Sequence, residues 1–332
     1  MSKLFNKYLF VLFVLICLAF VPTKKKKKWP KPIQTNSDTL RLNEKILLGR
    51  ALFFDPLLSY DNSISCASCH SPFNAFAHSD HRLSHGIFDS IGQRNAPPLF
   101  NLAWQKNFTW DGRAHHIDMQ TLAPINDPRE MGEKTKNIIS KLKKDSLYKS
   151  LFFSAFQDSS IQLIHFLKAI SAFELSLISN NSKYDQIMEG KDTFRSIERK
   201  GYKIFQKNCA VCHQEPLFSS YEFANNGLEI DSNLLDFGRG EITGTKEDSM
   251  TFKIPSLRNL NYTAPYMHDG RFSSIREVLN HYQSQKNTSI KNLKMALNER
   301  QKTELVAFLK TLNDTSFLLN PKNQYPSQIL HR

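Results

Sequence analysis

The sequence predicts a mainly α-helical protein of two similar domains, each built from a few helices and long loops. Three observations point to this fold class. One short cysteine motif occurs twice, beginning at Cys66 and at Cys209. Apolar residues recur at helical spacing around each copy, and no stretch shows the alternation of a strand-rich protein or the pattern of βαβ units. A chain of 332 residues is also long enough for two domains of ordinary size.

The elements of the first half follow from apolar spacing and turn-forming residues. The pattern over residues 40–54 predicts a short helix that leads into the first motif. Residues 71–135 hold many Pro, Gly, Asn and Asp residues with little periodicity, which predicts long loops. The clearest helix is expected over 161–178, where apolar residues recur at helical spacing. We therefore place a linker at 29–39 and a first domain at 40–190.

The second half repeats this layout. A helix expected at 193–207 leads into the second motif, and two more are expected at 274–282 and 298–312. Residues 214–272 should again form loops. Together these elements predict a second domain at 191–318, followed by a tail at 319–332.

The basic N-terminus predicts a targeting segment over residues 1–28. The formal net charge of the chain is +13, yet this segment alone holds seven lysines and no acidic residue. An apolar run from Tyr8 to Val21 follows the first two lysines, as in a signal segment for export. Cleavage and retention as a membrane anchor both stay open, and Cys17 in the run is interpreted as an apolar filler. The rest of the chain lacks interleaved basic and aromatic residues, so no nucleic-acid partner is expected.

The two cysteine motifs predict covalent haem. They are Cys66-Ala67-Ser68-Cys69-His70 and Cys209-Ala210-Val211-Cys212-His213, both of the form C-x-x-C-H. Two thiols three positions apart reach the two vinyl groups of one porphyrin, and the next histidine supplies the proximal nitrogen to iron. A zinc site would instead pair the two distant C-x-x-C units with each other. We expect two haem c groups, ligated by His70 and His213, in two cytochrome c-like domains exported from the cytoplasm.

Further stretches extend this pattern along the chain. They are Gly92 to Pro97 (GQRNAP), Trp110 to Ala114 (WDGRA), Gln120 with Pro124 and Glu130-Met131, Phe252 to Asn259 (FKIPSLRN) and Thr263 to Phe272 (TAPYMHDGRF). With the two haem motifs, they resemble the bacterial di-haem cytochrome c peroxidase family, which includes the methylamine-utilisation maturation enzymes. The resemblance runs from about residue 40 to residue 312 in one collinear order.

The resemblance implies a role for each matching residue. The haem attached at Cys66 and Cys69 would be the peroxidatic one, and the haem at Cys209 and Cys212 the electron relay. Trp110 matches a tryptophan between the two haems. Glu130 matches the distal carboxylate that moves protons during O–O cleavage, with the amide of Gln120 beside it. The resemblance also implies a calcium ion held by Asn95 and the backbones of Thr263 and Pro265.

Two positions depart from the classical peroxidases. Tyr282 stands where those enzymes have a methionine that ligates the relay haem, whereas tyrosine is that ligand in the maturation branch. A phenolate would lower the reduction potential, and the alternative is that Tyr282 only packs. The second position is His85, near the place of a histidine that ligates the peroxidatic haem at rest. His78 and His81 lie nearby, and the surrounding sequence looks more like the branch that lacks this ligand.

The sequence therefore predicts a periplasmic di-haem peroxidase that reduces hydrogen peroxide to water. Its electrons would come from a small redox protein, either a cytochrome c or a cupredoxin. One alternative is a maturation-type enzyme that oxidises a protein side chain, which Tyr282 favours. The other is a di-haem electron carrier without a substrate site, against which Glu130 and Gln120 argue, since a carrier needs no acid–base group. The resemblance also leaves a homodimer open.

Overall fold

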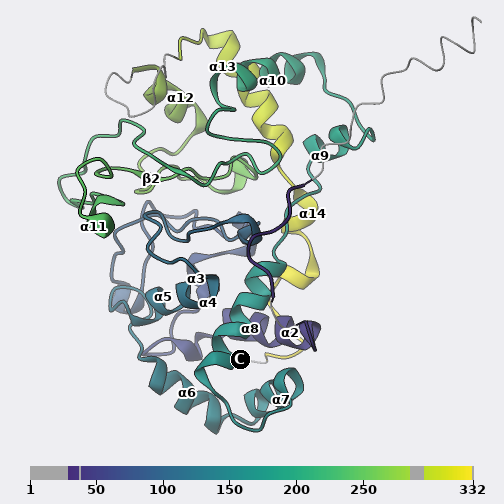
Figure 1. Cartoon of the computed structure of the whole chain (residues 1–332), viewed down its shortest axis with the longest axis vertical. Helices are drawn as coiled ribbons and strands as arrows, with labels where there is room; N and C mark the ends of the chain where they lie inside the picture. The colour runs from purple at the N-terminus through teal and green to yellow at the C-terminus, as the bar shows by residue number, and fades with distance from the viewer. Residues whose placement is uncertain (1–28, 37–38, 285–294, 331–332) are drawn as a thin grey trace, which may run out of the picture.

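The computed structural model describes residues 29–36, 39–284 and 295–330, and these form two stacked lobes (Figure 1). The lower lobe in Figure 1 holds the first cysteine motif and the upper lobe holds the second. The predicted signal segment at 1–28 lies outside the described residues. Among the residues that are described, no helix is long and apolar enough to cross a membrane.

The described chain is mainly helical, as predicted. The lower lobe contains α2 (Leu42–Phe54), α3 (Cys66–Cys69), α4 (Ile117–Gln120), α5 (Leu122–Asn126), α6 (Thr135–Lys144), α7 (Ser146–Phe156) and α8 (Leu163–Ser176). The later elements are α9 (Lys183–Met188), α10 (Ser196–Asn208), α11 (Gly240–Thr243), α12 (Ile275–Ser284), α13 (Glu299–Leu309) and α14 (Thr315–Leu318). A small antiparallel pair joins β1 (Phe223–Ala224) to β2 (Phe252–Lys253). Long loops connect these elements, above all over 71–116 and 214–274.

Each lobe is organised around one helix crossing that depends on a glycine. In the lower lobe α2 packs on α8, and in the upper lobe α10 packs on α13. A Cβ atom on Gly49 would overlap the carbonyl of Ala169, and one on Gly201 would overlap the carbonyl of Glu304. The two backbones can therefore approach closely only because these residues have no side chain.

The residues beside each glycine repeat as well. Four positions after the glycine, Phe53 packs on Phe173 with ring centroids 5.2 Å apart, and Phe205 packs on Phe308 at 5.1 Å. All four rings are fully buried. The two lobes thus repeat the same helix crossing, with a glycine at the contact and a phenylalanine pair beside it, as the repeated motif predicted.

Two parts of the fold differ from expectation. Helices α6 and α7 were not predicted, although α6 carries an amphipathic pattern with Ile138 and Leu142 buried. The C-terminal residues are not a free tail, because Phe317, Leu318 and Leu330 belong to the core of the lower lobe. Arg50 of α2 also donates to the carbonyl oxygens of Pro321 and Gln324, at 2.8 and 2.7 Å. The chain therefore returns to its first lobe, and the boundary predicted at residues 318/319 is wrong because the apolar residues on both sides of it pack in that core.

Replacing either crossing glycine by alanine tests this account. Helix propensity alone would make Gly49→Ala or Gly201→Ala stabilising by about 1 kcal/mol. Because the new methyl group would overlap a backbone carbonyl, we expect both variants to lose about 1–3 kcal/mol of unfolding free energy instead. Denaturant unfolding shows directly whether the free energy of unfolding rises or falls. The control is Gln206→Ala on the exposed side of α10, whose unfolding free energy should stay within about 0.5 kcal/mol of the parent. Stabilisation by either glycine substitution would contradict the close crossing.

Candidate haem sites and the contact between them

The first cysteine motif forms the short helix α3, which presents both thiols on one turn. Ser65 and Ser68 cap this helix, and the backbone N–H of Ser65 donates to Ser68 Oγ at 3.0 Å. His70 follows the helix, and its Nδ1 lies 2.9 Å from the carbonyl oxygen of Phe76. Since a carbonyl can only accept, Nδ1 carries the proton and Nε2 is left as the metal-binding atom. Burial lowers the pKa of His70 to about 4, which keeps the ring neutral, as an iron ligand must be.

The second motif repeats this arrangement. Nδ1 of His213 lies 3.2 Å from the carbonyl oxygen of Phe218 and 3.1 Å from that of Pro255. Burial lowers its pKa to about 4 as well. Burial therefore keeps both histidines neutral. The backbone carbonyl groups hold each ring in the tautomer whose Nε2 can bind iron.

The surroundings of both motifs fit a covalently bound haem. None of the four cysteines is in a disulfide. The second motif lines a large, mainly apolar cavity, whose opposite walls come from Leu257, Leu260, Ile275, Leu279, Leu305 and Leu309. Glu174 of α8 is buried near Cys66, and its Oε2 has no hydrogen-bond partner among the described groups, so a buried polar atom beside the first motif lacks a partner. Thiols, a preset imidazole and an apolar slot are the donor set and shape that a c-type haem requires.

Trp110 links the two lobes. It belongs to a loop of the lower lobe, yet it lines the cavity of the second motif together with Lys253 and His268. Its indole N–H donates to the carbonyl oxygen of Asn95 at 2.8 Å, and its own carbonyl accepts from the N–H of Lys253 at 2.7 Å. The structure thus places Trp110 in the wall where the first lobe meets the second haem site.

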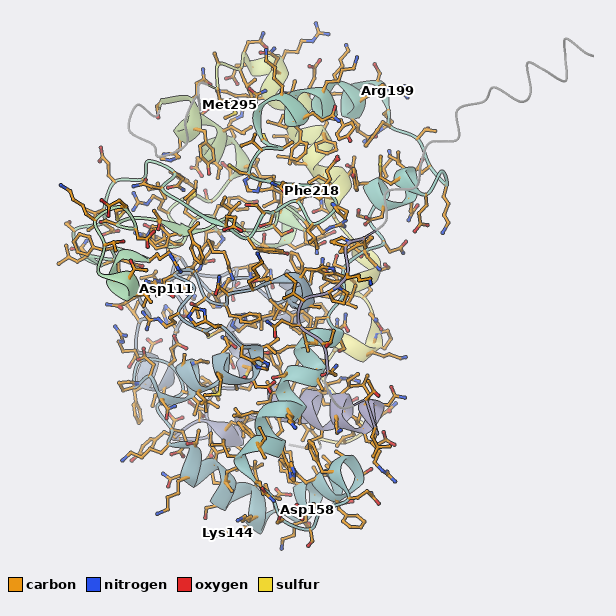
Figure 2. All side chains as sticks on the ribbon, in the orientation of Figure 1. Asp111, Lys144, Asp158, Arg199, Phe218 and Met295 are labelled. Carbon is orange, nitrogen blue, oxygen red and sulfur yellow. The ribbon has the colours of Figure 1, made fainter. Side chains whose placement is uncertain are left out.

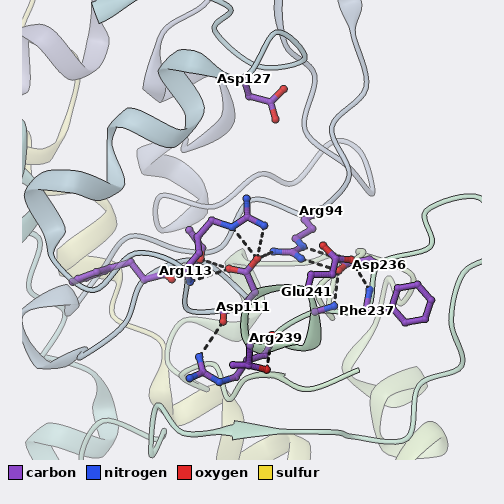
Figure 3. A network of polar contacts seen from close by, with 12 residues as sticks. Arg94, Asp111, Arg113, Asp127, Asp236, Phe237, Arg239 and Glu241 are labelled. Carbon is purple, nitrogen blue, oxygen red and sulfur yellow. Dashed lines mark hydrogen bonds and ion pairs between the residues drawn. The ribbon is translucent and has the colours of Figure 1, made fainter. Parts of the chain in front are cut away.

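Asp111, the chain neighbour of Trp110, belongs to a buried ion network (Figure 3). Arg94 donates to Asp111 at 2.6 Å and binds both oxygens of Asp236, in the upper lobe, at 2.6 and 2.7 Å. Arg113 also donates to Asp111, at 3.0 Å, and Arg239 donates to its carbonyl oxygen at 3.3 Å. Burial works to raise the pKa of the Asp111 carboxyl, but the charge of Arg94 outweighs it and holds that pKa well below its ordinary value.

The predicted distal pair lies on neighbouring short elements of the lower lobe. Gln120 ends α4, and Glu130 sits in the turn after α5; both side chains are half-buried. Burial, and then the charge of Asp127, raise the pKa of Glu130. After burial, the charge of Glu130 is among the causes that raise the pKa of the Cys66 and Cys69 thiols, which places this carboxylate close to the first attachment turn.

A hairpin over residues 85–91 holds the Glu130 turn in position. The N–H of Ile87 donates to the carbonyl oxygen of Glu130 at 2.8 Å. Gly86 faces this turn so closely that a side chain there would overlap the carbonyls of Arg129 and Glu130. The hairpin also carries His85, whose carbonyl lies 3.5 Å from Cys69 Sγ.

The side chain of His85 contacts Asp89 and His81. Its Nδ1 lies 2.8 Å from Asp89, and its ring packs at a tilt against His81 with centroids 4.4 Å apart. His81 in turn stacks on His78 at 5.7 Å. Because Asp89 engages only Nδ1, Nε2 of His85 stays available to a metal ion, and ligation of the first haem by His85 stays a prediction.

The three residues predicted to hold calcium come together at the lobe interface. Asn95, Thr263 and Pro265 all line the same cavity wall as Trp110. Asn95 Nδ2 donates to the carbonyl oxygen of Arg82 at 3.1 Å, and the N–H of Asn95 donates to the carbonyl oxygen of His268 at 2.7 Å. No group of three or more His, Cys, Asp or Glu side chains in the described part could hold a metal ion. A cation here would have to use amide and carbonyl oxygens, as predicted.

Tyr282 lies in the second cavity, and its ligation of the second haem stays a prediction. It projects from α12 into the space lined by Cys209, Cys212 and His213, and burial raises its pKa to about 12. Two methionines that the sequence analysis overlooked, Met267 and Met295, line the same cavity. Met267 Sδ already accepts a hydrogen bond from Asn226 at 3.3 Å.

The structure also reveals two buried titratable groups that were not predicted. Burial raises the pKa of Glu174 to about 8 and lowers that of Lys253 to about 7. Glu174 could have been noticed as the one acidic residue in the apolar helix 163–176. Lys253 donates to Gln105 Oε1 at 2.6 Å and to the carbonyl oxygen of Asn107 at 3.0 Å, contacts across the lobes that no local pattern indicates.

The fold and the sites define a c-type cytochrome with two haem sites, and comparisons with known proteins agree. The family model "Di-haem cytochrome c peroxidase" matches residues 43–193, and the "Cytochrome c" model matches residues 198–313. The chain is 35% identical over 285 residues to the methylamine utilization protein MauG of Methylorubrum extorquens, covering 81% of this chain and 78% of that protein. It is 34% identical over 282 residues to the cytochrome c peroxidase Ccp of Escherichia coli, covering 81% of this chain and 58% of that protein. This protein belongs to the di-haem cytochrome c peroxidase family.

Solved structures support the same conclusion. A MauG-like protein associated with microbial copper homeostasis superimposes with a TM-score of 0.82 at 30% identity, covering 91% of this chain and 98% of that chain. The diheme peroxidase BthA from Burkholderia thailandensis, at 20% identity, shares the fold with a TM-score of 0.73. The superposition with BthA covers 87% of this chain and 90% of the BthA chain.

We predict two covalent haems per chain. Because each motif presents two thiols and a preset imidazole, the mass of the denatured protein should exceed that of the polypeptide by two haem groups, with a c-type pyridine haemochrome spectrum. Replacing Cys209 and Cys212 together by serine should leave one haem, whereas Cys17→Ser should leave both. A wild-type stoichiometry of one would reject the assignment of both sites.

Proposed function

We propose that this protein is a periplasmic peroxidase that reduces hydrogen peroxide to water. The reaction consumes one peroxide, two protons and two electrons and yields two molecules of water. The electrons come one at a time from a small redox protein, a cytochrome c or a cupredoxin. When bound, the haem groups supply an iron with an open coordination position and a relay for electrons. The observation that carries the proposal is the half-buried Glu130, whose turn is held by Ile87 at 2.8 Å in the same hairpin that brings the carbonyl of His85 within 3.5 Å of Cys69 Sγ.

Glu130 supplies the proton chemistry that peroxide cleavage needs. O–O cleavage requires a base that takes the proton from one oxygen and returns it to the oxygen that leaves. Because burial raises the pKa of Glu130, its protonated form is a better match for the return step than an exposed carboxylate would be. The amide of Gln120, at the end of the neighbouring helix, orients the peroxide in this proposal. An electron carrier has no use for such a pair.

Trp110 provides the contact through which electrons pass from the second site to the first. Its ring lines the cavity of the second motif, while its loop belongs to the first lobe. A hydrogen bond from Trp110 to Asn95 and the adjacent Arg94–Asp111 pair hold it there. In our proposal a calcium ion bound by Asn95, Thr263 and Pro265 fixes the same wall, using the oxygen ligands that calcium prefers.

A second candidate function is the oxidation of a side chain in another protein. The position of Tyr282 in the second cavity favours it, since a phenolate ligand stabilises oxidised iron. Relatives named methylamine utilization protein MauG add to this support. Steady turnover of peroxide with reduced cytochrome c would favour the peroxidase. Reaction with peroxide but no turnover with any small donor would favour side-chain oxidation.

Replacing Glu130 by Gln tests the proposed proton transfer. The substitution keeps the size of the side chain but removes the base, so the rate of peroxide cleavage should fall by about 10²–10⁴-fold while both haems stay attached. Stopped-flow mixing of the reduced protein with peroxide measures this step without the donor. A near-normal rate would show that another group moves the proton.

Asp127→Asn is the matched control for this experiment. It removes a neighbouring carboxylate whose charge raises the pKa of Glu130. The control should therefore keep most of the activity and shift the acidic limb of the pH–rate profile to lower pH. A loss as large as that of Glu130→Gln would point to disruption of the turn rather than to loss of a base.

Removing calcium tests the interface proposal. Because the ion would fix Asn95 and, through it, Trp110, chelation should slow electron transfer between the haems and lower the steady-state rate. Both haems should remain attached, and added calcium should restore the rate. Asn95→Asp, which keeps an oxygen ligand, should retain calcium dependence, whereas Asn95→Leu should lose it. Activity that is indifferent to thorough chelation would contradict the site.

A further inference from the structure

Helix α10 carries a stripe of basic residues that leads to the second haem motif. Arg199, Lys203 and Lys207 follow one another at intervals of four residues, so they lie on one side of the helix, and all are exposed. The helix ends at Asn208, directly before Cys209. Val211, between the two cysteines of the motif, is 79% exposed. An apolar spot at the haem attachment turn thus lies at the end of a cationic stripe.

These charges are not neutralised within the described part of the chain. Lys203 and Lys207 take part in no ion pair there, and Arg199 donates only to the carbonyl oxygen of Phe194. The acid of α10, Glu198, is buried and already paired with Lys183 and Arg195, at 2.8 and 2.7 Å. Like charges four residues apart destabilise a helix by about 0.2–0.5 kcal/mol per pair. Repulsion along the stripe therefore works against the helix, and only Lys207, in the last turn, lies where the helix dipole favours a cation.

The repeated architecture shows that this helix face lacks a covering element. Aligning the crossing glycines, Gly49 with Gly201, pairs Ala51 with Lys203 and Asp55 with Lys207. Ala51 and Asp55 are fully buried, because α7 packs on α2 and Tyr148 donates to Asp55 at 2.7 Å. In the described part of the upper lobe, α10 has extensive packing with α13 alone. The face that α7 covers in one lobe is open and basic in the other.

We propose that the basic stripe of α10 and Val211 form the docking surface for an acidic redox protein, the electron donor of the proposed peroxidase. The proposal rests on that function and adds the charge of the partner and its place of contact. Electron donors bind briefly through small interfaces, and complementary charge around an apolar contact speeds their encounter. An acidic partner seated on Lys203 and Lys207 would contact Val211 and so approach the second haem at its attachment turn.

The test reverses charge at the stripe and at a matched site in the other lobe. Lys203→Glu with Lys207→Glu alters the stripe. Lys143→Glu with Lys144→Glu makes the same charge change on α6, at the opposite end of the molecule from Arg199 and α10 (Figure 2). Each full-length, two-haem variant is mixed with reduced c-type cytochromes of acidic and of basic isoelectric point, at several ionic strengths. Reaction of the pre-reduced protein with peroxide is measured separately.

The wild type should oxidise the acidic cytochrome faster than the basic one, with a rate that falls as salt rises. In the stripe variant the rate of oxidation of the acidic cytochrome should fall by at least about tenfold, which is within the range of electrostatic steering. The α6 variant should lose less than about twofold, and the peroxide step should not change in either. Equal losses in both variants, or a preference for the basic cytochrome, would overturn the proposal.

Two further outcomes distinguish this docking proposal from the proposed peroxidase function and from binding to a membrane. If peroxide does not react with any variant while the stripe variant alone fails to bind the acidic cytochrome in a titration, docking stands and the proposed peroxidase fails. Vesicles of anionic lipid are titrated in parallel. If the stripe controls binding to the vesicles and not to the cytochrome, the surface is a membrane contact and the docking proposal is rejected.

Discussion

The buried contact of Arg94 with Asp111 and Asp236 is the constraint on which the interface between the lobes depends. Each of these carboxylates would be costly to bury alone, because a charge taken out of water must be paired and hydrogen-bonded. Asp236 lies in the upper lobe, so the three groups are satisfied only when the lobes meet in one relative position. Such a network adds little net stability over an apolar contact, but it penalises any other arrangement.

This ion network holds in place the residues at the contact between the two haem sites. Arg94 and Asp111 are the chain neighbours of Asn95 and Trp110, and those two residues are themselves joined by a 2.8 Å hydrogen bond. A displacement of Arg94 would therefore move the indole in the cavity wall and the amide at the predicted calcium site together. If electrons pass through Trp110 and a cation binds at Asn95, as proposed, then both would depend on the same interlobe ion pairs through two adjacent pairs of residues.

The sequence predicted those features that repeat or that are local. The C-x-x-C-H motifs located both haem sites, and helical periodicity located α2, α8, α10, α12 and α13 to within a few residues. It missed α6 and α7, although Asp145 caps the start of α7 and lysines fill the last turn of α6, which are signals that the sequence does offer. It also missed the return of Phe317 and Leu330 to the first core, because nothing local shows which lobe an apolar residue will join. The sequence also cannot predict contacts such as that of Lys253 with Gln105, since they depend on how the two lobes meet.

The choice between the two candidate functions depends on the second cavity. Three side chains, Tyr282, Met267 and Met295, line it together with His213. Burial raises the pKa of Tyr282 to about 12, so its phenol is neutral unless a metal ion compensates the charge. If Tyr282 binds iron as a phenolate, it favours the oxidised state and opposes the acceptance of electrons from a weakly reducing donor. If a methionine binds instead, the potential is higher and such a donor suffices. The same fold could therefore serve either proposed function, and the residue that binds the iron of the second haem opposite His213 would determine which donors can reduce it.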